Sequence, residues 1–345
     1  MSQTSSRRTS AKIQEVARLA GVSIATVSRT FNLPEQVKPA TRSVVEGIAR
    51  QLAYYPNRSA STLRTQRSKV LGVVLPTLLN PVFAECMAGI AVAAKERGYA
   101  IIHATTEYQL ANEEQAVSEL QSRSVDGFIL VVSNPRTSRA LERVRAQGVP
   151  YVLLYSREAG HPCISVDGEK ALEELIERLA GLGHRRIAMV SGQLQASDRA
   201  QQRYRGFVAG MSRLGLDASS LIEVPFVETA VGRLAELLAQ RGRPSALVCS
   251  NDLLAIRAIR AAHLAGLVVP RDLSVVGFDG IRIGEDMTPM LSTIVQPNEE
   301  MGRRSIALVS DAQSAASARR PVESVSLEYY FREGESCARA PEGYS

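Results

Sequence analysis

The sequence predicts two regions of different fold class: an all-α helix-turn-helix head at the N-terminus, then an α/β region of two doubly wound subdomains with parallel sheets. Three observations support this prediction. Residues 13–32 have the pattern of two short helices joined by a glycine turn. From residue 70 onward, short apolar runs alternate with amphipathic segments. The basic excess of the chain is confined to its first fifth.

The pattern in residues 13–32, IQEVARLAGVSIATVSRTFN, is specific at several positions. Ala17 is small where two helices approach closely, Gly21 can adopt the left-handed conformation that ends a helix, and Val27 packs the second helix inward. Ser23 stands where the second helix needs an N-cap. The spacing predicts a helix-turn-helix whose second helix enters the major groove of DNA. The alternative is a small helical hairpin without DNA activity.

The charge distribution favours the DNA-binding interpretation. Residues 1–69 contain 12 Lys and Arg against 3 Asp and Glu, a net charge of +9, whereas residues 70–345 contain 29 basic and 32 acidic side chains, a net charge of −3. The overall net charge of +6 conceals this asymmetry. A basic segment with helical periodicity suits the phosphates of nucleic acid, because each neutralised phosphate releases counterions.

Residues 40–52 have apolar side chains at helical spacing, so we expect a third helix that completes the core of the head. The residues expected in that core are Val44, Val45, Ile48 and Leu52 of the third helix with Val16, Leu19 and Val27 of the first two. We therefore place a flexible N-terminal extension at 1–11 and the helix-turn-helix head at 12–53.

A linker at residues 54–69, which begins YYPNRSASTL, is expected to contain a short hinge helix. Pro56 suits a first helical turn, and Ala60 and Leu63 lie three apart on one face. An exposed leucine in a linker needs a partner. That partner is either the same segment of a second chain or a base step in the minor groove, where an apolar side chain kinks the duplex.

Seven short apolar runs between residues 70 and 333 are expected to be buried parallel strands: VLGVVL, AIIHA, GFILVV, YVLLY, RIAMV, ALVCS and SVVGF. The amphipathic segments at 83–96, 113–122, 172–182 and 253–265 are expected to be helices. A break near Asp167 suggests two similar halves. Ligands in such folds bind at the carboxyl ends of the strands, so the residues that follow each run are the candidates for a site.

Composition and motifs exclude several other classes. We find no signal-peptide core and no run of roughly 18 apolar residues, so we expect a cytoplasmic protein without a membrane partner. The cysteines lack metal-ligand spacing, so no metal or cofactor is expected, and Cys86, Cys163 and Cys249 are expected to be buried.

The alternatives to a DNA-binding regulator each leave one region unexplained. An α/β enzyme using Asp252 or Asp279 is disfavoured because the chain has no phosphate-binding loop, nucleophile elbow or zinc-protease motif. Neither an enzyme nor a solute-binding protein explains the head. An architectural DNA-binding protein leaves the large C-terminal region without a role.

Several motifs, in order along the chain, resemble the LacI/GalR family of transcriptional regulators. VARLAGVSIATVSRTFN resembles the family's head, YYPNRSASTL its hinge helix, LNPVFAECMAGI its first strand-to-helix turn and GHRRIAMVSG the opening of its second subdomain. RYRGF, SNDLLAI, SVVGFDG and LSTIVQP follow in family order. The resemblance extends from residue 12 to 333 and implies a periplasmic-binding-protein-like (type I) fold. The implied parts are subdomain one at about 70–167 plus 297–324, subdomain two at about 168–296 plus 325–333, and a flexible tail at 334–345.

The resemblance implies that Ile24, Ala25 and Arg29 contact bases. The two apolar side chains can contact thymine methyl groups, and Arg29 can make a bidentate contact to guanine. Leu63 matches the leucine that inserts at the operator centre, and the family's hinge helix is ordered on DNA. The expected DNA-binding residues are Ser23, Ile24, Ala25, Thr26, Ser28, Arg29, Asn57, Arg58, Ala60 and Leu63, of which Thr26 and Ser28 are expected at phosphates.

The resemblance also implies a small-molecule effector between the two subdomains. Arg203 and Asp279 match positions that hold polar groups of the ligand, and Phe83 and Phe226 offer apolar faces, a combination that suits a sugar. Arg199 is expected to share a helical face with Arg203, and two arginines would favour a sugar acid or a phosphorylated sugar. The expected effector-binding residues are Asn80, Phe83, Asp167, Arg199, Arg203, Phe226, Asn251, Asp279 and Gln296.

Structural roles compete with some of these assignments. Arg203 could form a structural ion pair, Asp252 is expected to cap the helix that starts at residue 253, and His184 is expected to be structural. Where the family often has aspartate on the ligand side of the first subdomain, this chain has Thr77 and Ser156.

The predicted function is that of a sequence-specific transcriptional regulator, with repression favoured over activation. The tail has no leucine heptad, so we expect a homodimer on a pseudo-palindromic double-stranded DNA operator. A sugar, sugar acid or related metabolite is expected to change its operator affinity. One departure in the head is Lys12, which stands where the family usually has a capping threonine.

Overall fold

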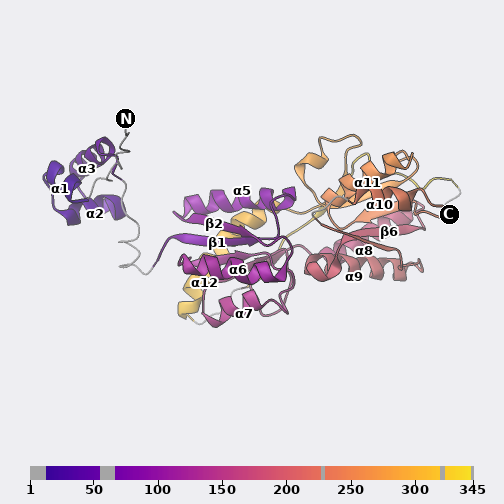
Figure 1. The fold of residues 1–345 in the computed structure, drawn as a ribbon, viewed down its shortest axis with the longest axis horizontal. Coiled ribbons are helices and arrows are strands. Elements are labelled where there is room, and N and C mark those ends of the chain that lie inside the picture. Colours follow the sequence, from indigo (N-terminus) through magenta and orange to yellow (C-terminus); the bar gives the residue numbers. More distant parts are fainter. Residues whose placement is uncertain (1–12, 55–66, 227–229, 319–322, 343–345) are drawn as a thin grey trace, which may run out of the picture. The chain divides into compact units, whose positions relative to one another are not determined.

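The structure is a computed structural model that describes residues 13–54, 67–226, 230–318 and 323–342. The chain divides into two compact units, here termed the head (Met1–Ser68) and the effector region (Lys69–Ser345). Figure 1 shows a helical head and an α/β effector region that consists of two subdomains. The head and the effector region each have a hydrophobic core of their own.

The described part of the head contains the helices α1 (Ile13–Ala20), α2 (Ile24–Asn32) and α3 (Pro39–Gln51), with a short 3-10 turn, η1 (Pro34–Gln36), before α3. Between α1 and α2, Gly21 has a φ of +65°. Ser23 caps α2, because the amide of Thr26 donates to its hydroxyl at 3.1 Å. The predicted helix-turn-helix, with its glycine turn and serine cap, is therefore confirmed.

The core of the head is narrower than the sequence pattern predicted. Its fully buried apolar residues are Val16, Ala17, Val27, Val45 and Ala49. Leu19 and Val44 were expected in it, but they are 48% and 51% exposed. The buried face of α3 runs through two residues four apart, Val45 and Ala49, and Val44 lies about 100° around the helix from Val45.

Subdomain one of the effector region contains a parallel sheet. Its strands are β1 (Val70–Leu75), β2 (Ala100–Thr105), β3 (Gly127–Leu130), β4 (Tyr151–Leu154), β5 (Cys163–Ser165) and β11 (Val325–Ser326), and their spatial order is β11-β5-β4-β3-β1-β2. The helices α5 (Pro81–Glu96) and α12 (Asn298–Ala318) cover one face, and α6 (Leu110–Ser122) and α7 (Arg139–Ala146) cover the other.

Subdomain two repeats this architecture. Its strands are β6 (Ile187–Gly192), β7 (Leu221–Val224), β8 (Ala246–Cys249), β9 (Ser274–Asp279), β10 (Ser292–Val295) and β12 (Tyr330–Arg332), in the order β12-β10-β9-β8-β6-β7. Only β12 is antiparallel to its neighbour among the described strands. The helices α8 (Gly168–Gly181) and α9 (Asp198–Arg213) cover one face, and α10 (Val231–Leu238) and α11 (Asp252–Leu264) cover the other. Two 3-10 turns, η2 (Leu194–Ala196) and η3 (Arg282–Gly284), complete the subdomain.

All seven apolar runs predicted as strands form strands, and the central strands of each sheet are buried on both faces. In β1, Val73 faces the α5 and α12 side of the sheet and Val74 faces the α6 and α7 side, which explains why the run is continuously apolar. The predicted burial of AIIHA is wrong, because β2 pairs on one side only and lies at the sheet edge, where its side chains are exposed or half-buried. The short strands β5, β7, β10, β11 and β12 were not predicted.

The chain crosses between the subdomains three times, after β5, after β10 and after β11. The last crossing lies between residues 326 and 330, slightly beyond the predicted boundary at 324, because Val325 and Ser326 pair with Ile164 and Ser165 in the first sheet. Each half of the effector region therefore contains a late segment of the chain, as the family resemblance implied.

The prediction of a flexible tail at 334–345 is wrong for its described part. Ser336 is fully buried, its hydroxyl donates to the carbonyl of Val275 at 2.6 Å, and the amide of Val275 donates to the carbonyl of Ser336 at 2.8 Å. The Ala338 amide donates to Ser274 at 3.1 Å. These bonds satisfy polar groups at the start of β9, which is why a polar, glycine-containing sequence packs there instead of moving freely.

Two further expectations concern single features of the described residues. Cys86, Cys163 and Cys249 are buried free thiols, as predicted. None of the helices in the described part of the chain is long and apolar enough to cross a membrane.

Candidate functional site

The exposed face of α2 carries most of the predicted DNA-binding residues of the head. Ile24, Ala25 and Arg29 are exposed, whereas Val27 on the opposite side is fully buried. Thr26 and Ser28 are half-buried at the margins of this face. The helix therefore presents two apolar side chains and one guanidinium together, which is the chemistry needed to contact thymine methyl groups and guanine. Asn57, Arg58, Ala60 and Leu63 lie outside the described residues.

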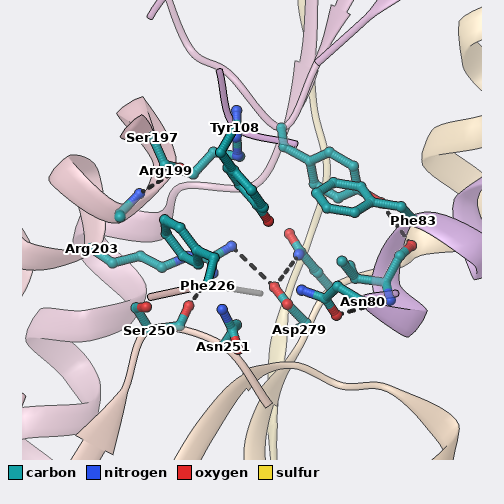
Figure 2. Close-up of a pocket in the computed structure, with 14 residues that line it drawn as sticks. Asn80, Phe83, Tyr108, Ser197, Arg199, Arg203, Phe226, Ser250, Asn251 and Asp279 are labelled. Carbon is teal, nitrogen blue, oxygen red and sulfur yellow. Dashed lines mark hydrogen bonds and ion pairs between the residues drawn. The ribbon is translucent and has the colours of Figure 1, made fainter. Parts of the chain in front are cut away.

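A pocket lies between the two subdomains at the carboxyl ends of their strands, where a ligand site is expected in doubly wound sheets (Figure 2). Eight of the nine predicted effector-binding residues line it: Asn80, Phe83, Arg199, Arg203, Phe226, Asn251, Asp279 and Gln296. They come from six separate segments, so only the folded chain brings them together. Their role in binding an effector remains a prediction.

Asp167 is the predicted effector residue that does not line this pocket. Its carboxylate caps α8 by accepting from the amide of Lys170 at 3.1 Å, and it forms an ion pair with Arg157. A helix cap that also pairs with an arginine accounts for an aspartate at this crossing between the subdomains.

Arg203 and Asp279 form a buried ion pair in the pocket. Arg203 Nη2 lies 3.1 Å from Asp279 Oδ1, and the two side chains are only 10% and 4% exposed. Gln296 Nε2 donates to the same carboxylate oxygen at 2.8 Å, Arg203 Nη1 donates to the carbonyl of Ser250, and the guanidinium lies 3.7 Å from the centre of the Phe278 ring. Contacts with the surrounding protein thus fix both members of the pair.

Burial shifts the pKa of both members of this pair. Desolvation raises the pKa of Asp279 from its ordinary value of 3.8 to about 7, and the Arg203 charge opposes that rise. Desolvation also lowers the pKa of Arg203. The ligand role and the structural ion-pair role that competed for Arg203 in the sequence are compatible here, because the pair lines the pocket while each partner stabilises the other.

A second buried aspartate, Asp252, fixes the turn that follows Asp279. Asp252 accepts from the Ile281 amide at 2.8 Å and from the Thr293 hydroxyl at 2.5 Å, so it joins the turn after β9 to β10. Gly277 of β9 lies against it, since a Cβ there would come within 2.0 Å of Asp252 Oδ1. Desolvation raises the pKa of Asp252 to about 6, against the two hydrogen bonds that lower it.

The predicted cap role of Asp252 is wrong. Asn251 is the N-cap of α11, where its side chain accepts from the Leu254 amide at 2.8 Å, and Asp252 is the first helical residue. Asn251 has the extended conformation of an N-cap, with φ −157° and ψ 164°. The asparagine therefore ends up both capping the helix and lining the pocket.

Arg199 connects the first turn of α9 to subdomain one. Its Nη1 donates to the carbonyl of Val132 at 2.8 Å and pairs with Asp198 at 2.9 Å, and the Asp198 amide donates to the carbonyl of Ser133 at 2.7 Å. Arg199 is 7% exposed, and its charge is balanced by Asp198. Its Nη2 is buried without a hydrogen-bond partner among the described residues.

Sequence reasoning missed several residues of the pocket, above all Tyr108 and Tyr155. Tyr108 follows β2 and stacks on Phe226, with ring centroids 4.4 Å apart and planes 12° apart. Tyr155 ends the run YVLLY, meets the Phe83 ring edge-on at 5.9 Å and donates to the carbonyl of Val82 at 3.3 Å. The available signal was their position, since Tyr108 follows a predicted strand and Tyr155 ends one. Ser197, Ala200 and Ser250 were missed as well.

His184 has a structural environment, as predicted. Its Nδ1 lies 2.9 Å from the Ser245 hydroxyl and its Nε2 lies 3.0 Å from the carbonyl of Ala338. Burial lowers its pKa. The histidine therefore holds the C-terminal segment against the start of β8.

Comparison with known proteins assigns both parts of the chain. The family described as "Bacterial regulatory proteins, lacI family" matches residues 12–57, and the "Periplasmic binding protein-like domain" matches residues 176–337. The transcriptional regulator DegA of Bacillus subtilis is 32% identical over 296 residues, which cover 84% of this chain and 88% of DegA.

Two solved structures agree with this assignment. A lac repressor dimer bound to operator and the anti-inducer ONPF superposes with a TM-score of 0.83 at 26% identity, covering 96% of this chain and 100% of the repressor chain. A LacI family transcriptional regulator from Enterococcus faecium with bound ribose superposes with a TM-score of 0.69 at 26% identity, covering 78% of this chain and 99% of that one.

Proposed function

This chain belongs to the lacI family of bacterial regulatory proteins and is a DNA-binding transcriptional regulator, and we propose that it is a homodimeric repressor whose operator affinity is set by an uncharged, ring-shaped polyol. The relatives reported above are regulators and not enzymes, and the proposal gives Asp252 and Asp279 no catalytic role. Because operator DNA is the target, the proposal places the protein in the cytoplasm.

The DNA-binding part of the proposal rests on the exposed face of α2. Ile24 and Ala25 offer apolar contact and Arg29 offers a bidentate donor, so together they can distinguish base pairs in the major groove. The similar lac repressor is a dimer on its operator. A two-fold symmetric protein suits a pseudo-palindromic operator, because each head then meets an equivalent half-site.

The choice of an uncharged effector over an acidic one rests on the charge balance of the pocket. The buried Arg203 is paired with Asp279, and the buried Arg199 is paired with Asp198. An anionic ligand would add an uncompensated charge to a desolvated site, which is costly. The hypothesis that two arginines favour a sugar acid therefore loses its support.

A neutral ring with hydroxyl groups fits the same site well. Hydroxyls can accept from the guanidinium of Arg203 and donate to the carboxylate of Asp279, and Asn251 adds a side-chain amide. Phe83 and Phe226 offer apolar surface for the face of the ring. The similar regulator from Enterococcus faecium holds ribose, which is such a molecule.

The test is a selection of bound duplexes from a random pool with the full-length protein, followed by operator titrations at one stated salt concentration. We expect an enriched pseudo-palindrome. We then expect a neutral sugar, from a panel that contains D-ribose and D-glucose, to change operator affinity by about 5- to 150-fold.

The matched arm of the titration uses D-gluconate and D-glucose 6-phosphate at the same concentrations, which should have no effect. A response to the acids alone would overturn the charge-balance argument while leaving the regulator intact. A pool without enrichment, both in the absence and in the presence of the neutral sugars, would contradict sequence-specific binding by the dimer.

A further inference from the structure

Two aromatic rings from opposite subdomains meet at the rim of the pocket. Tyr108 lies in the loop between β2 and α6 of subdomain one, and Phe226 follows β7 of subdomain two (Figure 2). Their rings stack with centroids 4.4 Å apart and planes 12° apart. Aromatic pairs in this arrangement add stability beyond the area that they bury.

The same two rings also line a second hollow, outside the pocket. Its other walls include Glu107, Gln109 and Gln193, which are exposed. Tyr108 and Phe226 are the residues that the two cavities share. The stacked pair is therefore the partition between the inner pocket and this outer hollow.

The groups that an effector must reach lie on the inner side of the partition. Arg203 is 8% and Asp279 3% exposed, so almost none of their surface meets solvent in this state. A ligand of several carbon atoms cannot reach them unless part of the protein moves. The stacked pair is a natural part to move, because each ring belongs to a different subdomain.

Tyr108 is held in position by an unusual turn. Glu107 and Tyr108 have φ values of +50° and +58°, and the Gln109 amide donates to the carbonyl of Thr106 at 2.9 Å to close the turn. Glycine or asparagine is the usual residue at such positions, because other side chains are strained there. A strained conformation persists where the surrounding structure fixes it, and such positions gather at ligand clamps and switches.

Phe226 is seated against the backbone of subdomain two. A Cβ on Gly192 would lie 2.2 Å from the Phe226 ring, so the ring needs a glycine there. Arg257 Nη1 donates to the carbonyl of Phe226 at 3.1 Å and fastens the main chain. Both rings are thus placed by features of their own subdomain and meet only when the subdomains are close.

We propose that Tyr108 and Phe226 form a gate over the effector pocket, which opens when the rings separate and controls the rate at which a small molecule enters and leaves. Subdomain one contributes the Tyr108 ring to this gate, and subdomain two contributes the Phe226 ring. The inference rests on the proposed effector pocket, but its test needs no effector and no DNA, so the two proposals can fail separately.

The test measures how fast N-ethylmaleimide reaches a cysteine inside the pocket of the full-length protein. Two reporter variants, Ser250→Cys and Ala200→Cys, each place a thiol in the pocket lining; Ser250 is suitable because its hydroxyl has no hydrogen-bond partner among the described residues. Both are made in a Cys337→Ser background, since Cys337 is the native cysteine that is only half-buried. Mass spectrometry assigns each adduct to its residue.

We expect slow labelling of the reporters behind the intact gate. Tyr108→Ala should accelerate it by about 2- to 10-fold, which corresponds to the loss of one aromatic pair. Tyr108→Phe should label at the parent rate, because the ring remains. Phe226→Leu should accelerate labelling like Tyr108→Ala, and the double variant should be no faster than the faster single variant, because both changes open the same gate.

The matched control is Tyr204→Ala, which removes a half-buried tyrosine that stacks on Phe207 but does not line the pocket. It should leave the reporter rates unchanged. The buried native Cys249 should stay unlabelled in every variant, which excludes general unfolding as the cause. Equal rates for Tyr108→Ala and its parent at both reporters, or equal acceleration by Tyr204→Ala, would overturn the gate.

Discussion

The head and the effector region expose their functional residues to opposite degrees. In the head, Ile24 is 47% exposed, and Ala25 and Arg29 beside it are exposed as well. In the effector region, Arg203 and Asp279 are buried and bonded to each other. The residues predicted to contact DNA can therefore change without disturbing the fold, whereas those predicted to contact the effector also hold the effector region together.

A similar contrast separates the two subdomains that form the pocket. The charged residues of its lining, Arg199, Arg203 and Asp279, all come from subdomain two. Subdomain one contributes Phe83, Tyr108 and Tyr155 with Asn80. This division is consistent with one subdomain that supplies apolar surface to the pocket and a second that supplies its charged groups.

The largest effect is expected from Asp279→Ala. It leaves the buried guanidinium of Arg203 without its counter-charge, and removing one partner of a buried pair costs about 3 to 5 kcal/mol. The free energy of unfolding of the effector region should fall by that amount in urea titrations. The effector response should disappear, while operator binding of the folded variant in the absence of effector remains.

Two matched variants sharpen this prediction. Asp279→Asn keeps an oxygen that can accept from Arg203 and Gln296, so it should cost less than Asp279→Ala. Glu300→Ala removes an exposed partner of Arg304 at i, i+4, and should cost less than about 0.5 kcal/mol. If Asp279→Ala were as stable as Glu300→Ala and still responded to the effector, Asp279 would neither stabilise the effector region nor bind the effector.

The second largest effect is expected from Arg29→Ala in the head. Because Arg29 is exposed, the change should leave the thermal unfolding of the protein nearly unchanged. Discrimination at one base of each half-site should fall by about 1 to 3 kcal/mol. Binding measured against the selected operator and its single-base variants checks this. A uniform loss across all the duplexes would instead make Arg29 a phosphate contact.

The pH dependence of stability tests whether burial raises the pKa of Asp279, the carboxylate of the buried Arg203–Asp279 pair. In the unfolded chain an aspartate titrates near 3.8, whereas desolvation raises the pKa of Asp279 to about 7 in the folded protein. The folded state therefore binds this proton more tightly, and the stability that it contributes at low pH is lost as the pH rises from about 4 to about 7.

The free energy of unfolding of the parent should consequently fall relative to that of Asp279→Asn as the pH rises through this window. The expected slope is at most about 1.4 kcal/mol per pH unit. Urea titrations of both proteins at several pH values give it, and the difference includes the repulsion between Asp252 and Asp279, which also raises the pKa of Asp279. A constant difference across the window would mean that Asp279 is ionised throughout, because the charge of Arg203 outweighs the desolvation.

The sequence predicted those features of the fold and pocket that depend on local pattern. Apolar runs predicted the central strands, the Gly21 and Ser23 spacing predicted the helix-turn-helix, and the positions after the strands predicted most of the pocket. Asp252 was assigned to a helix cap because a residue before an apolar run suits that role. Its actual partners, Ile281 and Thr293, are far away in the sequence.

Other features escaped prediction because they depend on contacts between distant segments. The stacking of Tyr108 on Phe226 joins two loops more than one hundred residues apart, and no local pattern marks either ring. The C-terminal segment looked flexible because it is polar and short of periodicity, yet Ser336 completes the hydrogen bonds of β9. Asp167 was expected in the pocket by its place in the chain, but its own helix and Arg157 hold its carboxylate.

The smallest predicted effect concerns Ser23, which qualifies the contrast between exposed and buried functional residues. Ser23 is exposed and belongs to the predicted DNA-binding set, yet its hydroxyl caps α2 by accepting from the Thr26 amide at 3.1 Å. Ser23→Ala should therefore destabilise the head by about 1 kcal/mol, and Ser23→Asp, which retains a capping oxygen, should restore most of that stability.

The two Ser23 variants also separate the two roles of the residue, because a carboxylate caps a helix well but is repelled by phosphate. Ser23→Asp should fold like the parent and bind the operator more weakly, while Ser23→Ala should lose stability with a smaller loss of affinity. Circular dichroism of thermal unfolding and operator titrations measure the two effects. If Ser23→Asp bound operator as tightly as the parent, Ser23 would lie away from the DNA, and α2 would contact it through Ile24, Ala25 and Arg29 alone.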